Sequence, residues 1–371
     1  MDNKKIILIT NEYPPKRGGA GVYCEELIHS SKELGISIEG WVPKYAKFEK
    51  NSNFISLPIK GSQDWICSWR IIKHFKKQQA KMPKNTVLHL AEPGSLRAFI
   101  RFGWIFKELP ELLITIHGSE LIRFCKSPVE SFFFQKLLKQ TKTIHVLSKF
   151  NKEKVETFCP GIKERILLLP GAAARKVKGD LSNKEKAVKT KIKVLCVGRI
   201  HPRKGQDLLI EAVCALPADL KKKLECVFVG PIVKKKFFRE LQKKVAGTNC
   251  KVSFLGELAD EELKMVYESA DIFALASMPR AKSIEGFGFV YLEASSHGLP
   301  ILAHRTGGVE DAVKENETGI LTDPKIPIEL RNGLEKLIND FSLRKRLGNA
   351  GKDWANKNSW TEIAQQIYQS D

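Results

Sequence analysis

The chain has 371 residues, of which 43% are hydrophobic and 28% are charged, an ordinary composition for a globular protein with two domains. No stretch is long and apolar enough to cross a bilayer, and the apolar run near the N-terminus is too short for a secretory signal, so the sequence predicts a cytoplasmic protein. The formal net charge is +20, and the first 175 residues carry 29 Lys and Arg against 16 Asp and Glu, which favours anionic partners: phosphorylated ligands, anionic lipids or nucleic acid.

Short apolar runs alternate with amphipathic stretches from end to end. Runs that are apolar throughout are typical of parallel strands covered on both faces, and the stretches between them supply the crossover helices. The sequence therefore predicts an α/β fold with two doubly wound, Rossmann-like domains that face a cleft. The expected strands are 6–10, 36–42, 53–57, 86–90, 112–116, 143–147 and 166–170 in the first half, and 193–198, 225–230, 251–256, 272–276, 299–303 and 318–322 in the second.

The expected linker is the polar, charged segment 176–191, which has no aromatic residue. It separates an N-terminal domain at 1–175 from a C-terminal domain at 192–371. The pattern of the last helix, at about 361–370, does not decide whether that helix stays with the second domain or packs back on the first. Ligands of doubly wound folds bind beyond the carboxyl ends of the strands, so the loops that follow the strands hold the candidate residues.

The first strand of each half is followed by a loop suited to phosphate. In the first half, Gly18 and Gly19 precede a helix, and glycines there let backbone amides approach an anion. The alternative is a turn that only needs glycine. In the second half, the run GRIHPRKG at 198–205 puts Arg199 at the strand end and Lys204 at the start of the next helix, where two cations suit a pyrophosphate. The alternative is a solvated basic loop, but its position at a strand end favours phosphate.

The run EGFGFVYLE at 285–293 contains two glutamates. We expect Glu285 in a loop and Glu293 about two turns into the following helix, roughly 9 Å further along its axis. The two carboxylates could then meet opposite ends of an extended ligand, while the first amides of the helix hold phosphate or sugar oxygens. Taken singly, Glu285 is better explained as a partner of the helix dipole, and Glu293 as part of a solvated helix face.

Three further features belong to the first half. His117 follows the run 112–116, where it could orient a hydroxyl, although a lone histidine is more often structural. The stretch 65–77 is aromatic and basic, so it suits either an anionic membrane surface or the domain core. For the similar stretch 96–107, core packing is favoured.

Together and in this order, these segments resemble the retaining GT-B glycosyltransferases with an E-x7-E signature, the glycosyl transferases group 1. The runs that carry the resemblance are GRIHPRKGQDLLIEAV, FLGELADEEL, SADIFALAS and IEGFGFVYLEASSHGLPILAHRTGGVEDAV, and the likeness extends over nearly the whole chain. Within this family, the chain most resembles bacterial phosphatidylinositol mannosyltransferases and related lipid-directed mannosyl- or glucosyltransferases.

The resemblance implies a metal-independent hexosyltransferase without a cofactor. It would move mannose from GDP-mannose, or glucose from UDP-glucose, to a lipid-linked or glycolipid acceptor bound on the N-terminal side, as a peripheral protein on the inner face of the cytoplasmic membrane. The catalytic roles would fall to His117, Arg199, Lys204 and Glu285. The donor-binding roles would fall to Gly18, Gly19, Gly256, Leu258, Phe287, Gly288, Phe289 and Glu293.

In that assignment, Arg199 and Lys204 neutralise the leaving pyrophosphate, and Glu285 binds hydroxyls of the transferred sugar. Glu293 holds the ribose hydroxyls, and the region Gly256–Leu258 borders the base. Three alternatives stay open: Glu285 as a covalent nucleophile, the same chemistry with a soluble thiol, polyol or sugar as acceptor, and a basic nucleic-acid-binding protein. No recognised nucleic-acid module favours the last, so we expect no nucleic-acid partner.

Overall fold

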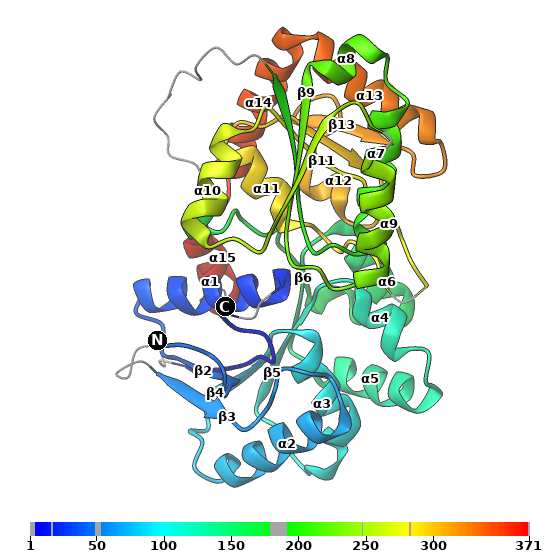
Figure 1. Cartoon of the computed structure of the whole chain (residues 1–371). Helices are drawn as coiled ribbons and strands as arrows, with labels where there is room; N and C mark the ends of the chain where they lie inside the picture. Colours follow the sequence, from blue (N-terminus) through cyan, green and yellow to red (C-terminus); the bar gives the residue numbers. More distant parts are fainter. Residues whose placement is uncertain are drawn as a thin grey trace. The chain divides into compact units, whose positions relative to one another are not determined.

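The computed structural model describes residues 4–15, 18–48, 53–178, 191–246, 248–281 and 283–369. The chain forms two compact units, one of Met1–Gly171 with Ser359–Asp371 and one of Ala172–Asn358, which we call unit 1 and unit 2. Figure 1 shows a parallel sheet between helices in each of them.

Unit 1 contains a seven-stranded parallel sheet in the order β3-β2-β1-β4-β5-β6-β7. The chain moves outward from β1 to β3, then returns to the other side of β1 with β4, which is the doubly wound arrangement. The strands are β1 Lys5–Ile9, β2 Ile38–Pro43, β3 Phe54–Leu57, β4 Thr86–Leu90, β5 Glu111–Ile116, β6 Thr143–Val146 and β7 Ile166–Leu168.

Helices cover both faces of this sheet. The helices α2 and α3 lie side by side on one face, with α5 next to α3, whereas α1 and α15 pair on the other (Figure 1). A hydrophobic core lies between α2, α3, α5 and the sheet, with Phe75, Phe99 and Phe134 among its buried side chains. The helices are α1 Gly19–Glu33, α2 Trp65–Gln79, α3 Pro93–Phe102, η1 Gly103–Ile105, α4 Ser119–Phe124, α5 Pro128–Gln140, α6 Lys149–Phe158, η2 Lys163–Arg165 and α15 Trp360–Tyr368.

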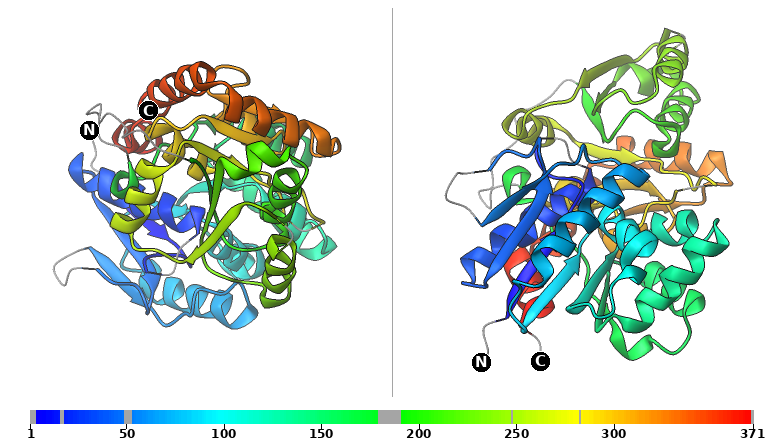
Figure 2. Two further views of the ribbon diagram at one scale, coloured as in Figure 1. Left: turned by 45° about the horizontal axis from the view of Figure 1, so that its top comes forward. Right: turned by 90° about the horizontal axis from the view of Figure 1, so that it is seen from below.

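The last helix, α15, belongs to unit 1 although it ends the chain. Figure 2 shows it beside α1 in both views. Ser359 caps its first turn, and the hydroxyl of Tyr368 lies 2.6 Å from Nδ1 of the buried His89 on β4. Trp360 packs edge-on against Tyr23 of α1, with 5.8 Å between ring centroids. The hydrogen bond to His89 and the ring contact with Tyr23 therefore attach the helix to the core of unit 1.

Unit 2 repeats the topology with six parallel strands in the order β10-β9-β8-β11-β12-β13. The strands are β8 Ile192–Val197, β9 Leu224–Val229, β10 Lys251–Gly256, β11 Ile272–Leu275, β12 Ile301–His304 and β13 Gly319–Thr322. Helix α7 contacts α9 and α13, and α11 contacts α14 (Figure 1). The helices are η3 Arg175–Val177, η4 Pro202–Lys204, α7 Gln206–Cys214, α8 Ala218–Lys222, α9 Lys235–Ala246, α10 Asp260–Ser269, α11 Phe289–Ser296, α12 Val309–Ala312, α13 Pro327–Asn339 and α14 Phe341–Asn356.

The predicted fold class is confirmed, since each unit is a doubly wound parallel α/β domain. Every strand expected from the sequence is present, with its ends displaced by no more than two residues. Most of the expected linker, residues 179–190, lies outside the described residues, while 172–178 belong to unit 2. Within the described ranges, no helix combines the length and apolar character needed to cross a bilayer.

Candidate active site

The candidate site of unit 2 lies where the strand order reverses. Strands β8 and β11 are neighbours in the sheet, yet the chain leaves them toward opposite sides. The loops beyond their carboxyl ends therefore diverge and leave room for a ligand. Glu285 lies at this point, because its carboxylate contacts Lys204 from the loop after β8 and Ser277 from the segment after β11.

The Glu285 carboxylate is the centre of a buried charged cluster. Its Oε2 accepts hydrogen bonds from Lys204 Nζ at 2.7 Å, from Arg203 Nη1 at 2.8 Å and from Ser277 Oγ at 3.0 Å. Burial alone raises the pKa of Glu285, but the charges of Lys204 and Arg203 outweigh burial and hold that pKa well below its usual range. Glu285 is thus ionised, and the interpretation as a mere helix-dipole partner is wrong.

The loop after β8 is shaped by glycine and by a histidine cap. Gly205 has φ 64°, and a Cβ placed on it would lie 1.8 Å from the carbonyl oxygen of Ala276, so only glycine allows this approach to the end of β11. His201 Nδ1 accepts from the Arg203 amide at 3.1 Å. Lys204 ends the short helix η4, whereas the sequence predicted it at the start of the next helix, which begins at Gln206. This 3-10 turn presents Arg203 and Lys204 to the same carboxylate.

A second close approach holds the backbone of Glu285. The Gly308 amide donates to the Glu285 carbonyl at 3.0 Å. Gly307 has φ 57°, and a Cβ there would lie 2.0 Å from the same carbonyl oxygen. The glutamate is therefore held through both its backbone and its side chain, which is the preorganisation that a catalytic group requires.

Glu293 is also buried, but its environment is different. Helix α11 begins at Phe289 after Gly288, whose φ is 90°, so Glu293 lies one turn into the helix and not two. Only 9% of Glu293 is exposed, and it accepts a hydrogen bond of 3.1 Å from the hydroxyl of Tyr267. The interpretation as a solvated helix face is therefore wrong. The rings of Phe287 and Phe289 are buried on either side of Gly288, with centroids 5.5 Å apart.

Three predicted residues of unit 2 lie at strand ends without joining the cluster. Arg199 follows β8 and is exposed, and its carbonyl accepts from the Gln206 side chain at 3.0 Å. Gly256 ends β10 with φ 71°, and Leu258 follows it, half-buried. The cationic partners of Glu285 are Lys204, which the sequence analysis named, and Arg203, which it did not. The role of Arg199 at the pyrophosphate stays a prediction.

The glycine loop of unit 1 follows β1 as predicted. Gly18 precedes α1, and Gly19 is the first residue of that helix. The Gly18 amide donates to Glu12 Oε2 at 3.0 Å, so a carboxylate satisfies the amide that we had expected for phosphate. Lys16 and Arg17 of the same loop lie outside the described residues.

His117 follows β5 and has a defined hydrogen on Nε2. This nitrogen lies 2.9 Å from the carbonyl oxygen of Ala91, and because a carbonyl only accepts, Nε2 carries the hydrogen. The His117 amide donates to Glu120 Oε1 at 2.8 Å, and the ring packs edge-on against Tyr23 at 5.0 Å. An imidazole held in this orientation fits a residue that orients a hydroxyl.

The sequence analysis missed three residues of these arrangements: Arg203, Ser277 and Tyr267. Arg203 could have been found, since it stands beside Lys204 in the basic loop. Ser277 follows the apolar run 272–276 at a strand end, which is a weak signal. Tyr267 carries none, because a tyrosine inside an amphipathic helix is typical of core packing.

Known proteins resemble the chain in both sequence and fold. Residues 177–354 match the family model described as Glycosyl transferases group 1. The chain is 24% identical over 392 residues to the GDP-mannose-dependent alpha-(1-6)-phosphatidylinositol monomannoside mannosyltransferase of Mycobacterium tuberculosis, covering 98% of this chain and 97% of that one. It is 34% identical over 192 residues to the D-inositol 3-phosphate glycosyltransferase of Corynebacterium glutamicum, covering 50% of this chain and 44% of that one.

Among solved structures, Anabaena HepE in complex with UDP and glucose matches 99% of this chain and 98% of its own, with a TM-score of 0.76 and 20% identity. At that identity the likeness shows the fold alone. The fold is the two-domain GT-B architecture, as the sequence predicted.

Proposed function

Because the chain belongs, through residues 177–354, to the glycosyl transferases group 1 family, we propose that this glycosyltransferase moves a mannose or glucose from a nucleotide diphosphate sugar to a lipid-linked or glycolipid acceptor, with retention at the anomeric carbon. The observation that carries the proposal is the buried cluster in which Glu285 holds Lys204 and Arg203 at the switch point of unit 2. Two cations fixed at that position suit a diphosphate that gains negative charge as it leaves.

The charge that develops in the reaction explains these roles. As the bond between the anomeric carbon and the diphosphate oxygen breaks, positive charge grows on the sugar and negative charge on the diphosphate. Lys204, Arg203 and the exposed Arg199 stabilise the diphosphate more in the transition state than in the ground state, so they accelerate the step. The acceptor hydroxyl attacks from the same face, and its proton passes to the departing diphosphate oxygen, which balances the step without a protein nucleophile.

Glu285 serves the sugar through its second oxygen. The three hydrogen bonds described above all go to Oε2, and within the described residues no partner engages Oε1. Oε1 is therefore suited to accept hydrogen bonds from hydroxyls of the transferred hexose. The amides of Phe287, Gly288 and Phe289 at the start of α11 would donate hydrogen bonds to the same hexose. Glu293, one turn further, would accept from the ribose hydroxyls.

The donor and the acceptor are proposed from the relatives. The M. tuberculosis relative is GDP-mannose-dependent and acts on phosphatidylinositol monomannoside, and HepE was solved with UDP and glucose. GDP-mannose and UDP-glucose are therefore the donors to test, with a phosphoinositide glycolipid as acceptor on the inner face of the cytoplasmic membrane. The cations of the basic loop take the role of a metal, so we expect activity to survive chelation.

A panel of nucleotide sugars tests the proposal on the purified chain. Thermal shift reports binding, and release of the nucleoside diphosphate reports turnover, each with and without a chelator and with acceptor lipid in vesicles. We expect one donor to raise the melting temperature and to react, and the anomeric configuration of the product to match that of the donor. The proposal is wrong if no nucleotide sugar stabilises the protein or reacts.

A soluble acceptor is the second candidate, since the C. glutamicum relative is a D-inositol 3-phosphate glycosyltransferase. The chemistry at Glu285 would be the same, and only the acceptor differs. Transfer to a phosphorylated polyol in the absence of any lipid would favour this function, whereas activity that requires vesicles would favour the first.

A further inference from the structure

Unit 1 exposes a set of large apolar side chains on three neighbouring elements. Trp65 is 60% exposed, Trp104 58% and Phe132 63%, although burial would stabilise each of them. Contiguous apolar surface of this kind usually marks an interaction site. We call this set the apolar patch, and it comprises Trp65, Ile66 and Trp69 on α2, Trp104 and Ile105 on η1, and Val129 and Phe132 on α5.

The α2 part of the patch rests on α3. The ring of Phe102 packs edge-on against Trp65 at 5.7 Å and against Trp69 at 5.4 Å between centroids. The guanidinium of Arg101 lies 4.2 Å from the ring centroid of Trp65, which is a cation–π contact. The two exposed tryptophans of α2 are therefore supported from beneath by the end of α3.

The η1 and α5 parts join through a second phenylalanine. Phe133 stacks with Trp104 at 6.2 Å and contacts Phe132 edge-on at 5.3 Å. The indole nitrogen of Trp104 donates to the Arg101 carbonyl at 2.8 Å, so Trp104 is also tied to the residue that supports Trp65. These contacts link the three elements that carry the patch.

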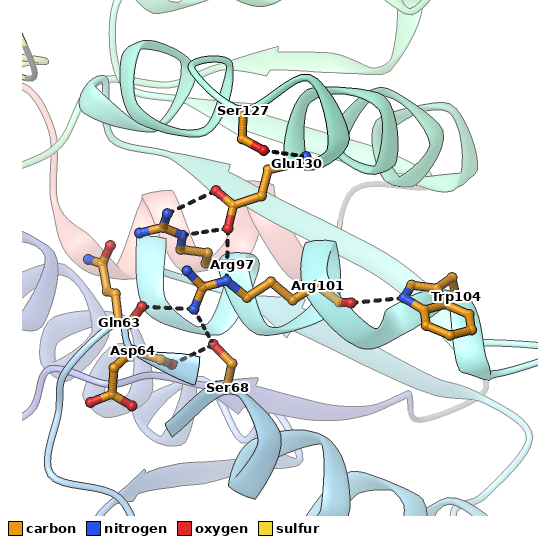
Figure 3. Close-up of polar contacts among 8 residues, drawn as sticks. All are labelled: Gln63, Asp64, Ser68, Arg97, Arg101, Trp104, Ser127 and Glu130. Atoms are coloured by element: carbon orange, nitrogen blue, oxygen red, sulfur yellow. Dashed lines mark hydrogen bonds and ion pairs between the residues drawn. The ribbon is translucent and has the colours of Figure 1, made fainter. Parts of the chain in front are cut away.

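A buried ion-pair cluster beneath the patch holds these elements together. Figure 3 shows the guanidinium groups of Arg97 and Arg101 turned toward Glu130 on α5, which is buried. Glu130 accepts from Arg97 at 3.1 and 2.9 Å and from Arg101 at 2.8 Å. Arg101 also donates to the Gln63 carbonyl and to the Ser68 hydroxyl on the α2 side. These bonds fix the patch before any partner binds, which reduces the entropy lost on binding.

The charge around the patch is strongly positive. The exposed cations on or beside the same elements are Arg70, Lys73, Lys76, Lys77, Lys107, Lys126, Lys136 and Lys139, whereas the exposed acids there are Asp64 and Glu108. Aromatic rings flanked by lysines are typical of surfaces that lie in the headgroup region of anionic bilayers. A protein partner of ordinary composition would not require this excess of cations.

A cavity of about 490 Å³ adjoins the patch. Apolar rings and ammonium groups, with one carboxylate, meet in this hollow, which is lined by Trp104, Phe133, Lys107, Lys136 and Glu108 among others. It also reaches Leu112 at the amino-terminal end of β5, whereas His117 follows the carboxyl-terminal end of that strand. The hollow is thus separate from the candidate residues of this unit and suits an anionic amphiphile.

We propose that the apolar patch docks unit 1 on a bilayer that contains anionic lipid. The tryptophans and Phe132 enter the interface, and the surrounding lysines bind the lipid phosphates. This inference deepens the proposed function, since it names the surface through which the enzyme reaches a lipid acceptor. The surface extends beyond α2 to η1 and α5, where the sequence alone favoured core packing of 96–107.

Vesicle flotation with the full chain tests the proposal without any sugar donor. We expect binding to phosphatidylcholine vesicles that contain phosphatidylglycerol, little binding to phosphatidylcholine alone, and release by salt. The double variant Trp104→Ser/Phe132→Ser should lower partitioning by at least about tenfold, because it removes two interfacial rings. Phe341→Ser is the matched control, since Phe341 is 67% exposed on unit 2, and it should bind like the wild type.

A second variant covers the case in which the double variant misfolds. Lys136→Glu/Lys139→Glu alters only exposed charges of α5 and should weaken binding to the anionic vesicles by a similar factor. The proposal is overturned if the wild type does not float with anionic vesicles at low salt, or if the folded variants float as the wild type does. Donor turnover is measured separately in the absence of vesicles, so the failure of docking and the failure of the proposed glycosyl transfer are distinguishable.

Discussion

Replacing Glu285 with alanine leaves two buried cations without their counter-charge. The side chains of Lys204, Arg203 and Glu285 are only 11–12% exposed, so water cannot replace the lost carboxylate effectively. Removing one partner of a buried ion pair costs about 3–5 kcal/mol of unfolding free energy. Glu285→Gln keeps the shape and one acceptor, and we expect it to cost about 1–3 kcal/mol.

The sign of the pH dependence follows from the pKa of Glu285, which lies below its usual value. The stabilisation is fully present above the unfolded pKa and is lost as the pH falls through the folded pKa. A comparison at pH 7 therefore measures the whole effect. Differential scanning calorimetry is the assay, since it can resolve the unfolding of each unit.

The same experiment contains a test of function. A nucleoside diphosphate supplies negative charge beside Lys204 and Arg203, and at a concentration of about 100 times Kd it stabilises the folded state by about 2.7 kcal/mol. We expect the nucleotide to stabilise Glu285→Ala by at least as much free energy as it stabilises the wild type. Its kcat should fall by about 100- to 1000-fold, as expected for the loss of a preorganised electrostatic contact.

Glu310→Ala is the matched control, because Glu310 pairs with Arg305 in unit 2 on an exposed surface. It should change stability by less than about 1 kcal/mol. If Glu285→Ala loses as little stability as this control, the buried cluster does not contribute to the unfolding free energy as its geometry requires. If Glu285→Ala is unstable but turns over at the wild-type rate, the cluster is structural and the assignment of Glu285 to the sugar is refuted.

Three further outcomes are expected. Glu293→Gln should raise the KM for the donor about tenfold with little change in kcat, in steady-state kinetics, because it weakens the acceptor for ribose hydroxyls in ground and transition state alike. Gly205→Ala should lower the unfolding free energy by more than about 2 kcal/mol in calorimetry, since the added Cβ would meet the Ala276 carbonyl. Gly256 has a similar φ, but no atom lies close to the position of its Cβ, so Gly256→Ala should lower the unfolding free energy by about 1–2 kcal/mol. Burial lowers the pKa of His145 to about 4, so below pH 6.5 the unfolded chain binds more protons than the folded chain. Denaturation curves should therefore show that the unfolding free energy of the wild type falls by about 3 kcal/mol more than that of His145→Gln between pH 6.5 and pH 4.

Short sequence segments were enough to predict most of the fold and the class of enzyme. Short runs of mostly apolar residues, such as Ile272–Leu275, predicted the strands because a strand that is buried on both faces favours apolar side chains at every position. The loops GRIHPRKG and EGFGFVYLE identified the residues Lys204, Glu285 and Glu293 as candidates, since glycine and charge at strand ends are visible in any short window.

Tertiary structure alone decided which of these residues interact. That Glu285 contacts Arg203 depends on β8 and β11 being neighbours, and these strands are some 75 residues apart in the chain. The burial of Glu293 beneath Tyr267, and the attachment of α15 to unit 1 through Tyr368, have no local signal either.

The apolar patch is a further feature that the sequence pattern did not predict. The stretch 96–107 has the pattern of a core helix, and Phe99 is indeed buried, yet Trp104 is exposed because the helix ends at Phe102 and η1 turns the chain outward. A periodic pattern in the sequence predicts which face of an element is apolar. Whether that face is covered depends on which other elements pack against it, and distant parts of the chain supply those elements.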